Sequence, residues 1–284
     1  ISHEGAGACL AWIGGLGSAY DGRLAMSRRV TRFAIVVVTT VATMLALAPA
    51  SSAVELPPAP ARFDYQLGGA RAVPDFVKIV ARDRLDQPLL GKYNICYVNG
   101  FQTQPDAQRF WRQHWRLVLK RKGRPVVDQA WGEWLLDIRT PRKRRALARI
   151  VGAWINGCAA SGFQAVEFDN LDSFTRSRRL IKPRHANQFA RLLVARAHTA
   201  GLAAAQKNRA EWDGRRVGFD FVVAEQCGQY DECGRYVSNY GARVLDIEYT
   251  PAGFTRACTG WAATISILYR DLALSPTGVR TWCA

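Results

Sequence analysis

Short apolar segments recur along the chain after residue 60, and each of them ends in polar residues. Runs of four to eight residues that are apolar throughout are typical of strands buried on both faces, as in a parallel sheet. A weaker candidate of the same kind is Val126–Asp128. The eight segments that we predict to be strands are Phe63–Leu67, Phe76–Ala81, Tyr93–Asn99, Ala165–Asp169, Leu202–Asn208, Phe219–Glu225, Val244–Tyr249 and Thr264–Tyr269.

Helical periodicity fills two of the intervals between these segments. Apolar residues recur at spacings of three and four over Arg142–Ala160 and again over Pro183–Gly201, and a glycine lies at or near the end of each pattern. Strands that alternate with helices predict a parallel sheet. Eight strands in about 225 residues predict a (β/α)8 TIM barrel of the α/β class, somewhat compressed and formed by a single domain. A doubly wound open sheet is the alternative, although no Gly-x-Gly-x-x-Gly motif follows a strand.

The beginning of the chain has the pattern of an export signal. Met26 is followed by the basic segment Ser27–Arg32, by the apolar run Phe33–Ala48 and by small residues up to Ala53. This is the order of a signal peptide with cleavage after Ala50 or Ala53, and an apolar run of about 16 residues is short for a membrane span of about 20. A retained N-terminal anchor is the alternative.

After cleavage of the signal peptide we expect a secreted monomer that is not attached to a membrane. The predicted organisation of the chain has four parts. The parts are a leader with no role in the fold over residues 1–25, a signal peptide over 26–53, a Pro-rich linker over 54–61 and the barrel domain over 62–284.

The cysteines agree with export. An even set of six follows the leader, and in an exported protein such a set predicts up to three disulfides. Cys227 and Cys233 are separated by only five residues and form the one pair that proximity suggests. The remaining four would complete the set as Cys96–Cys158 and Cys258–Cys283, although the sequence leaves 15 pairings open. A zinc site is the alternative, but without a Cys-x-x-Cys motif and with scattered histidines we expect neither a metal nor a cofactor.

The charge of the chain carries information about partners. The sequence has 39 Lys and Arg residues against 23 Asp and Glu, a net charge of +16, and 49% of its residues are hydrophobic. That apolar fraction excludes a disordered or collagen-like chain. The net charge favours contact with anionic surfaces such as nucleic acid, teichoic-type polymers or phospholipid headgroups.

Carboxylates terminate three of the predicted strands, namely Asp169, Glu225 and Glu248. Functional side chains of a TIM barrel lie where its strands end, so these three should converge on one pocket together with Lys207 and Asn208. Crowded like charges push pKa values apart and leave a protonated acid beside an ionised carboxylate, which is the equipment for cleaving a glycosidic bond. The alternative is that the three form internal salt bridges with Lys207 or with arginines.

An ordered set of short motifs is similar to those of a known family. The motifs are Phe63–Gly69, Val166–Asp172, Gln206–Asn208, Glu225–Cys227 with Cys233, and Ile247–Tyr249. With them the chain resembles glycoside hydrolase family 114, a family of TIM-barrel proteins that includes endo-α-1,4-polygalactosaminidases. The resemblance implies an endo-acting hydrolase of an α-linked, galactosamine-containing (or related) polysaccharide.

The resemblance also implies roles for single residues. Asp169 would be the nucleophile and Glu225 the acid/base of a two-carboxylate mechanism. The residues that would hold sugar hydroxyls or tune this pair are Tyr65, Gln66, Asn170, Asp172, Lys207, Asn208, Glu248 and Tyr249.

Two features bear on the substrate. The loop Asn99–Pro105 differs from the Glu/Arg-rich segment that many family members carry after the third strand. Residues 54–284 carry 35 Lys and Arg against 21 Asp and Glu, and this net charge of +14 would repel a de-N-acetylated, polycationic galactosamine polymer. We therefore expect an N-acetylated, neutral or anionic substrate rather than a cationic one that is attracted locally by the acidic pocket.

The basic stretches Arg116–Arg124 and Arg139–Arg149 support a rival interpretation. A non-catalytic exported protein could use them to bind an anionic cell-wall polymer or nucleic acid. The simpler explanation is that they form the solvated flank of a helix, so we expect a polysaccharide substrate and no specific nucleic-acid partner. A barrel that kept the fold and lost hydrolysis is a third interpretation.

Overall fold

The structure is a computed structural model, and it describes residues 53–284. The predicted leader over 1–25 and nearly all of the predicted signal peptide lie outside the described residues. No helix in the described part combines the length and the apolar character that a membrane span requires.

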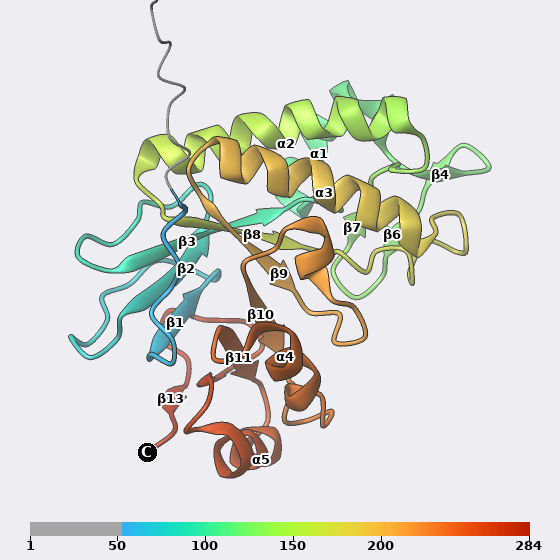
Figure 1. The fold of residues 1–284 in the computed structure, drawn as a ribbon. Coiled ribbons are helices and arrows are strands. Elements are labelled where there is room, and N and C mark those ends of the chain that lie inside the picture. Colours follow the sequence, from blue (N-terminus) through green and yellow to red (C-terminus); the bar gives the residue numbers. More distant parts are fainter. Residues whose placement is uncertain (1–52) are drawn as a thin grey trace, which may run out of the picture. The chain divides into compact units, whose positions relative to one another are not determined.

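Eight parallel strands form the central sheet and follow one another around it in chain order (Figure 1). A ninth strand, β13 (Arg280–Trp282), is antiparallel to the last of them. Each predicted strand overlaps one of the eight, and the predicted α/β TIM barrel is confirmed. The eight strands are β1 (Phe63–Gln66), β2 (Ile79–Asp83), β3 (Tyr93–Asn99), β8 (Ala165–Asp169), β9 (Ala203–Lys207), β10 (Phe221–Glu225), β11 (Val244–Glu248) and β12 (Ser266–Arg270).

The barrel is nearly closed, and side chains complete it between β1 and β12. In the described residues no backbone ladder joins these two strands. Instead the Arg270 guanidinium donates to the carbonyl oxygen of Tyr65, and Nε1 of Trp282 donates to the carbonyl oxygen of Phe63 at 2.7 Å. The seam therefore depends on long side chains from the C-terminal strands.

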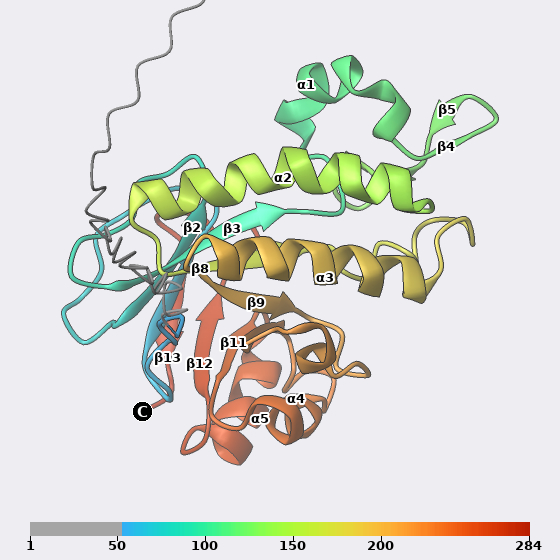
Figure 2. The same ribbon diagram turned by 45° about the horizontal axis from the view of Figure 1, so that its top comes forward.

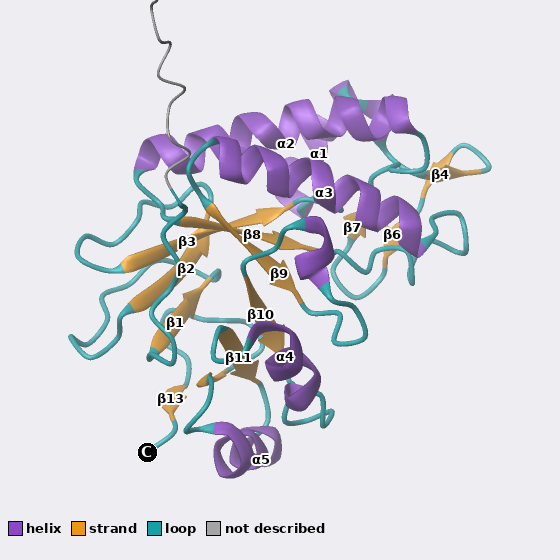
Figure 3. Ribbon diagram, viewed as in Figure 1, coloured by secondary structure: helices purple, strands orange, loops and turns teal. Residues whose placement is uncertain are grey.

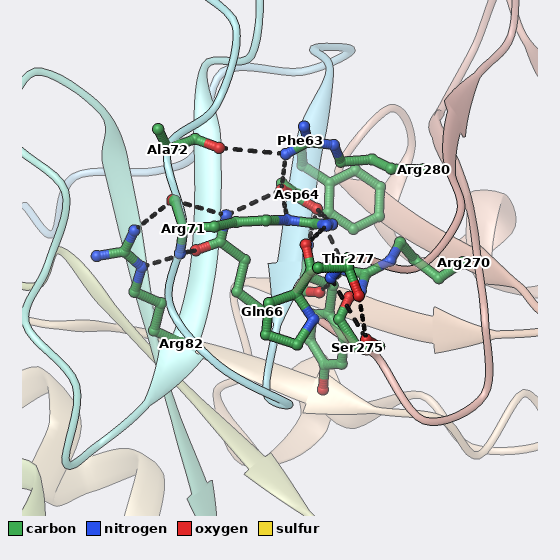
Figure 4. A network of polar contacts seen from close by, with 12 residues as sticks. Phe63, Asp64, Gln66, Arg71, Ala72, Arg82, Arg270, Ser275, Thr277 and Arg280 are labelled. Atoms are coloured by element: carbon green, nitrogen blue, oxygen red, sulfur yellow. Dashed lines mark hydrogen bonds and ion pairs between the residues drawn. The ribbon is translucent and has the colours of Figure 1, made fainter.

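Asp64 on β1 is the centre of this seam (Figure 4). Its fully buried carboxylate accepts hydrogen bonds from Arg280 at 3.0 Å, Arg270 at 3.3 Å and Arg71 at 3.4 Å. Burial would raise the pKa of Asp64, but the hydrogen bonds from Gln66, Arg280 and Arg71 outweigh it and hold that pKa below its usual value. One anion thus joins β1, β12 and β13.

Two long helices, α2 (Pro141–Ser161) and α3 (Pro183–Thr199), lie side by side over one flank of the sheet (Figure 2). Each begins with proline, whose fixed φ suits the first turn. The Thr140 side chain caps α2, and Gly162 ends it at a φ of 93°. The apolar faces predicted for both helices are buried against the strands.

The barrel has fewer helices than its name implies (Figure 3). Within residues 53–284 no helix connects β1 to β2 or β2 to β3, and β9 is joined to β10 only by the 3₁₀ turn η3 (Gly214–Val217). The first two connections are short and contain Gly68, Gly69, Pro74, Pro88 and Gly91, which oppose a helix. The remaining connections hold α4 (Cys233–Tyr240) and α5 (Pro251–Trp261).

A long insertion between β3 and α2 lies at the end of the barrel where the strands end. Val126–Asp128, the weak strand candidate, corresponds to β6 in this insertion and pairs with β7 outside the barrel sheet. The elements of the insertion are η1 (Pro105–Ala107), α1 (Gln108–Gln113), η2 (Trp115–Leu117), β4 (Lys120–Arg121), β5 (Arg124–Pro125), β6 (Val127–Asp128) and β7 (Glu133–Trp134).

Three disulfides join the six cysteines in the arrangement considered from the sequence. Cys96–Cys158 connects β3 to α2, Cys227–Cys233 closes the loop after β10, and Cys258–Cys283 connects α5 to the C-terminal segment. Asp246 lies near the second pair, but because those two sulfur atoms are bonded to each other they do not form a metal-ligand set.

The Pro-rich segment 54–61 has no helix or strand and lies against the barrel. The Tyr93 hydroxyl donates to the carbonyl oxygen of Glu55 at 2.8 Å, and Val54 and Leu56 pack on the residues that fill the barrel interior. These contacts anchor the segment to β3.

Candidate active site

The interior of the barrel is formed by alternate residues of each strand. Because successive side chains of a strand point to opposite faces, one set on each strand faces inward and the other faces the helices and loops. The inward set includes Phe63 and Tyr65 on β1, Tyr93 and Ile95 on β3, Ala165 on β8, Ala203 and Ala205 on β9, Phe221 and Val223 on β10, and Leu245 and Ile247 on β11.

Continued to the strand ends, the same alternation brings polar residues from five strands, and one from the position that follows β11, to the mouth of the barrel. Their side chains replace the apolar filling of the lower layers. They are Tyr65, Tyr97, Glu167, Asp169, Lys207, Glu225 and Tyr249.

Lys207 lies at the centre of this group, and only 3% of its side chain is exposed. Its Nζ is 3.1 Å from Oε1 of Glu167, 3.5 Å from Oε2 of Glu225 and 3.8 Å from Oδ2 of Asp169. Burial alone would lower the pKa of Lys207, but these three carboxylates raise it well above its ordinary value. The ammonium group therefore stays charged.

The structure brings Asp169 and Glu225 together across that cation. Oδ2 of Asp169 and Oε2 of Glu225 lie 3.8 and 3.5 Å from Nζ of Lys207. The separation of these two oxygens therefore cannot exceed the sum of the two distances. Carboxyl separations of about 5–5.5 Å are characteristic of retaining glycosidases and about 6.5–9.5 Å of inverting ones. The two carboxylates are thus close enough to act on one sugar ring.

Asp169 is held from two sides. The Tyr97 hydroxyl donates to Oδ2 at 2.7 Å, and the backbone N–H of Asn170 donates to Oδ1 at 2.6 Å. Its side chain is 20% exposed, so the carboxylate can still meet a ligand.

Glu225 has an equivalent set of donors. The Tyr249 hydroxyl donates to Oε1 and Nδ2 of Asn208 donates to Oε2, at 2.6 and 2.9 Å. Burial would raise the pKa of Glu225, but Lys207 and these hydrogen bonds outweigh it and lower that pKa. Like charges were expected to leave one of the pair protonated. The cation between them offsets that repulsion, so Glu225 is ionised in the protein without a ligand.

Glu167 lies one inward position below Asp169 and is fully buried. Tyr65 donates to its Oε1 at 2.6 Å, and Lys207 contacts the same oxygen. Burial raises the pKa of Glu167 to about 7, with Asp169 adding to the shift and Lys207 opposing it. This layer supports the ammonium group from below.

Asn170, Asn208 and Gln226 each follow a charged strand-terminal residue, and all three have left-handed backbone, with φ of 65°, 53° and 60°. Asparagine tolerates this conformation better than most residues. The same sharp turn after β8, β9 and β10 ends the strands at one level and leaves their last side chains directed inward.

Gln66 and Glu248, both predicted to contact substrate, belong to the outward-facing set. Gln66 is 1% exposed; its amide donates to Asp64 and accepts from Nε of Arg82, each at 2.9 Å. Glu248 is fully buried and accepts from the backbone N–H of Gly228 at 2.6 Å. Of the three carboxylates predicted to converge, Asp169 and Glu225 therefore do so, whereas Glu248 holds the loop after β10.

Two residues near Asp169 and Glu225 were not predicted from the sequence. Tyr97 could have been found, because it occupies an inward position near the end of β3. Glu133 could not, because it lies on the β6–β7 hairpin and reaches the site only through tertiary contacts. Nδ2 of Asn99 donates to it at 2.9 Å, and Nδ2 of Asn170 at 3.3 Å. Burial raises the pKa of Glu133 to about 7.

A cleft of about 400 Å³ opens beside Glu225. Asn208 and Asp172 line it, and both carboxylate oxygens of Asp172 accept from Arg176 at 2.8 Å. Tyr230, 63% exposed on the disulfide-closed loop, presents an aromatic ring along the same cleft. Flat aromatic rings of this kind suit the apolar faces of sugars.

Comparison with known proteins decides the family. The sequence model of glycoside-hydrolase family GH114 matches residues 44–284. The chain belongs to this family. It is therefore a glycoside hydrolase, and the family resemblance of its strand-end motifs is confirmed.

Two solved structures have a similar fold. Ega3 of Aspergillus fumigatus in complex with galactosamine is similar with a TM-score of 0.65 and 19% identity, over 81% of this chain and 99% of that one. The glycoside hydrolase domain of PelA from Pseudomonas aeruginosa is similar with a TM-score of 0.52 and 18% identity, over 78% and 98%. A comparison with curated protein sequences gives no match. The two structures support the barrel fold of this GH114 member.

Proposed function

We propose that this GH114 enzyme is a secreted, endo-acting hydrolase of an α-linked, galactosamine-containing polysaccharide. The observation that carries the proposal is the meeting of Asp169 and Glu225, from β8 and β10, around Lys207 at the mouth of the barrel. The galactosamine in the Ega3 complex supports the substrate class. The three disulfides support secretion, because such bonds persist in oxidising compartments.

In the proposed reaction Asp169 attacks the anomeric carbon while the bond from that carbon to the leaving oxygen breaks. Glu225 gives its proton to that oxygen, so the product leaves as a neutral alcohol. Glu225 then takes a proton from water, whose oxygen displaces Asp169 and frees the sugar. Lys207 and Tyr97 contact Asp169 and orient it for its attack.

Glu225 must gain a proton before it can act as the acid. Its pKa in the free enzyme lies below the usual value, since Lys207, Tyr249 and Asn208 stabilise its charge. Binding of a sugar removes water from the cleft, and desolvation favours the neutral carboxyl. Proton uptake therefore accompanies formation of the reactive complex.

The charges that line the cleft bear on the form of the polymer. Glu232 has no cationic partner within residues 53–284. The other three carboxylates of the lining are paired, as Asp172–Arg176, Glu211–Arg209 and Glu225–Lys207. Lys207 is shared with Asp169 and Glu167, and Arg176 with Asp128, so an excess of negative charge remains at the site. Residues 54–284 as a whole nevertheless carry a net charge of +14. That overall positive charge opposes the approach of a polycation and favours N-acetylated sugar units over free amines.

Digestion of a defined polymer tests the proposal. The protein is incubated with α-1,4-linked galactosaminogalactan, in N-acetylated and deacetylated forms, and the products are sized with time. We expect a ladder of oligosaccharides from the acetylated form and none with Asp169→Asn. Release of monosaccharide alone would contradict endo-action. Cleavage of neither form, with wild type and Asp169→Asn binding them alike, would overturn the substrate assignment.

The roles of the two carboxylates are separable with aryl glycosides. A good leaving group needs no protonation, so Glu225→Gln should recover much of its activity on such substrates. Asp169→Asn should not recover, because the attack itself is lost. Equal recovery of both variants would overturn the proposed roles.

A further inference from the structure

A strongly basic groove lies apart from the carboxylate site, between the η2 turn and the first turns of α2. It encloses about 780 Å³. This basic groove is defined by His114, Arg116, Arg142, Lys143, Arg145 and Arg149. It thus combines parts of the two basic stretches recognised in the sequence.

Most of these cations lack an anionic partner. Arg116, Arg142 and Arg145 are exposed, and within residues 53–284 no ion pair or hydrogen bond occupies their guanidinium groups. The same holds for Arg149, whereas Lys143 shares the carboxylate of Asp137 with another arginine. The basic groove therefore presents uncompensated positive charge from two separate elements.

The position of this charge is unfavourable for the helix itself. The first turn of α2 contains no acidic residue, and cations at a helix N-terminus oppose the positive end of its dipole. Cations also act on two groups outside the lining: burial and Lys143 lower the pKa of Lys120, and burial with Arg184 and Arg144 lowers that of His185. Charge that weakens local structure in this way is typical of a ligand-binding surface.

The chemistry of the lining points to phosphate groups. Guanidinium groups bind phosphate oxygens in pairs, and several in one groove can follow the charges of a linear polymer. Single-stranded nucleic acids are usually held by aromatic rings on which bases stack. Among the residues that line the basic groove, only His114 has a ring. We propose that the basic groove binds a flexible polyol-phosphate polymer, through its phosphodiester backbone alone.

The location of the basic groove gives such binding a consequence. Barrel helices run back against the strands that precede them, so the first turn of α2 lies at the end where the strands end. The insertion between β3 and α2 supplies Arg116 to the basic groove and Glu133 to the candidate active site. A bound polyanion would hold the enzyme beside its polymer matrix without occupying the cleft. Cleavage of short soluble substrates needs no such tether.

Charge reversal within the groove tests the proposal. We would measure binding of the secreted protein to labelled, lipid-free poly(glycerol phosphate) at several salt concentrations. Each phosphate contact on a flexible chain contributes about 0.7 to the salt slope, so wild-type affinity should fall steeply with salt. Arg142→Glu/Arg145→Glu should weaken binding roughly tenfold or more and lower the slope by about 1.4. This variant should fold well, because acids suit a helix N-terminus.

A matched control separates the basic groove from net charge. Arg235→Glu/Arg243→Glu changes the protein's charge equally, on exposed residues of α4 and the turn after it. It should leave binding within about twofold, since general attraction is screened beyond a Debye length of about 8 Å. Both variants should hydrolyse soluble oligosaccharides like wild type. Equal loss in the control would overturn the site.

Two further measurements complete the test. Arg116→Gln/Arg149→Gln removes charge from both walls of the basic groove and should also weaken binding, so unchanged affinity would overturn the proposal. Tighter binding of single-stranded DNA with the same number of phosphates would overturn the polymer assignment in favour of nucleic acid.

Discussion

The hydroxyl group of Tyr97 donates a 2.7 Å hydrogen bond to Oδ2 of Asp169. The two residues are 72 positions apart and belong to adjacent strands of the barrel. An ionised carboxylate that must attack a carbon atom depends on donors that hold its charge and its direction. Tyr97 is thus a positioning residue for the proposed nucleophile.

Tyr97→Phe should lower kcat about ten- to a hundredfold, because a hydrogen bond to a charged group contributes about 1.5–3 kcal/mol. KM should change little if the bond matters mainly in the transition state. Steady-state kinetics on one oligosaccharide would measure both. Tyr93→Phe is the control, since the Tyr93 hydroxyl on the same strand bonds only the Glu55 carbonyl. A similar loss in the control would point to a general effect on β3.

The proton on Glu225 should govern the pH dependence. Its pKa is lowered in the free enzyme and the acid acts only when protonated, so kcat/KM should fall as pH rises above that pKa. Tyr249→Phe removes a donor to the ionised form and therefore raises the pKa of Glu225. The decline of kcat/KM should move to higher pH in this variant. A decline that moved to lower pH would contradict the role of Tyr249.

Glu167 should make stability depend on pH. Its folded-state pKa of about 7 lies above the usual 4.5, so its contribution is present below about pH 4.5 and is lost as pH rises through about 7. The loss is at most about 3 kcal/mol of the free energy of unfolding. Denaturant unfolding at pH 5 and pH 8 would measure it, and Glu167→Gln should reduce the difference. Glu211→Gln, on an exposed carboxylate, should leave the difference unchanged.

Asp64→Asn should destabilise the protein by about 3–5 kcal/mol, since it leaves several guanidinium groups without their buried anion. The free energy of unfolding from denaturant melts would show this. Asp213→Asn is a control at the surface, where the partner Arg215 is half exposed and a loss below about 1 kcal/mol is expected. Comparable losses at both positions would argue against the seam as the weak point of the barrel.

The sequence by itself determined the local features of this protein. Continuous apolar runs predict the eight strands, because a strand buried on both faces has no polar side to show. The helix over Arg142–Ala160 is predicted by its apolar periodicity and by Gly162. The strand-end motifs indicate the family. The sequence did not determine the pairing of the cysteines, since proximity along the chain suggests one disulfide and says nothing of the other two.

Tertiary structure decided which strand-end residues share the site. Gln66 and Glu248 face outward while Tyr65 and Tyr249, their neighbours in sequence, face inward, because side chains alternate and a strand's phase is set by what the barrel encloses. The apolar residues of each strand indicate which of its positions face inward. Glu133 is different, since its place beside Asp169 depends on how a long insertion packs across the mouth, and no local pattern records such a contact.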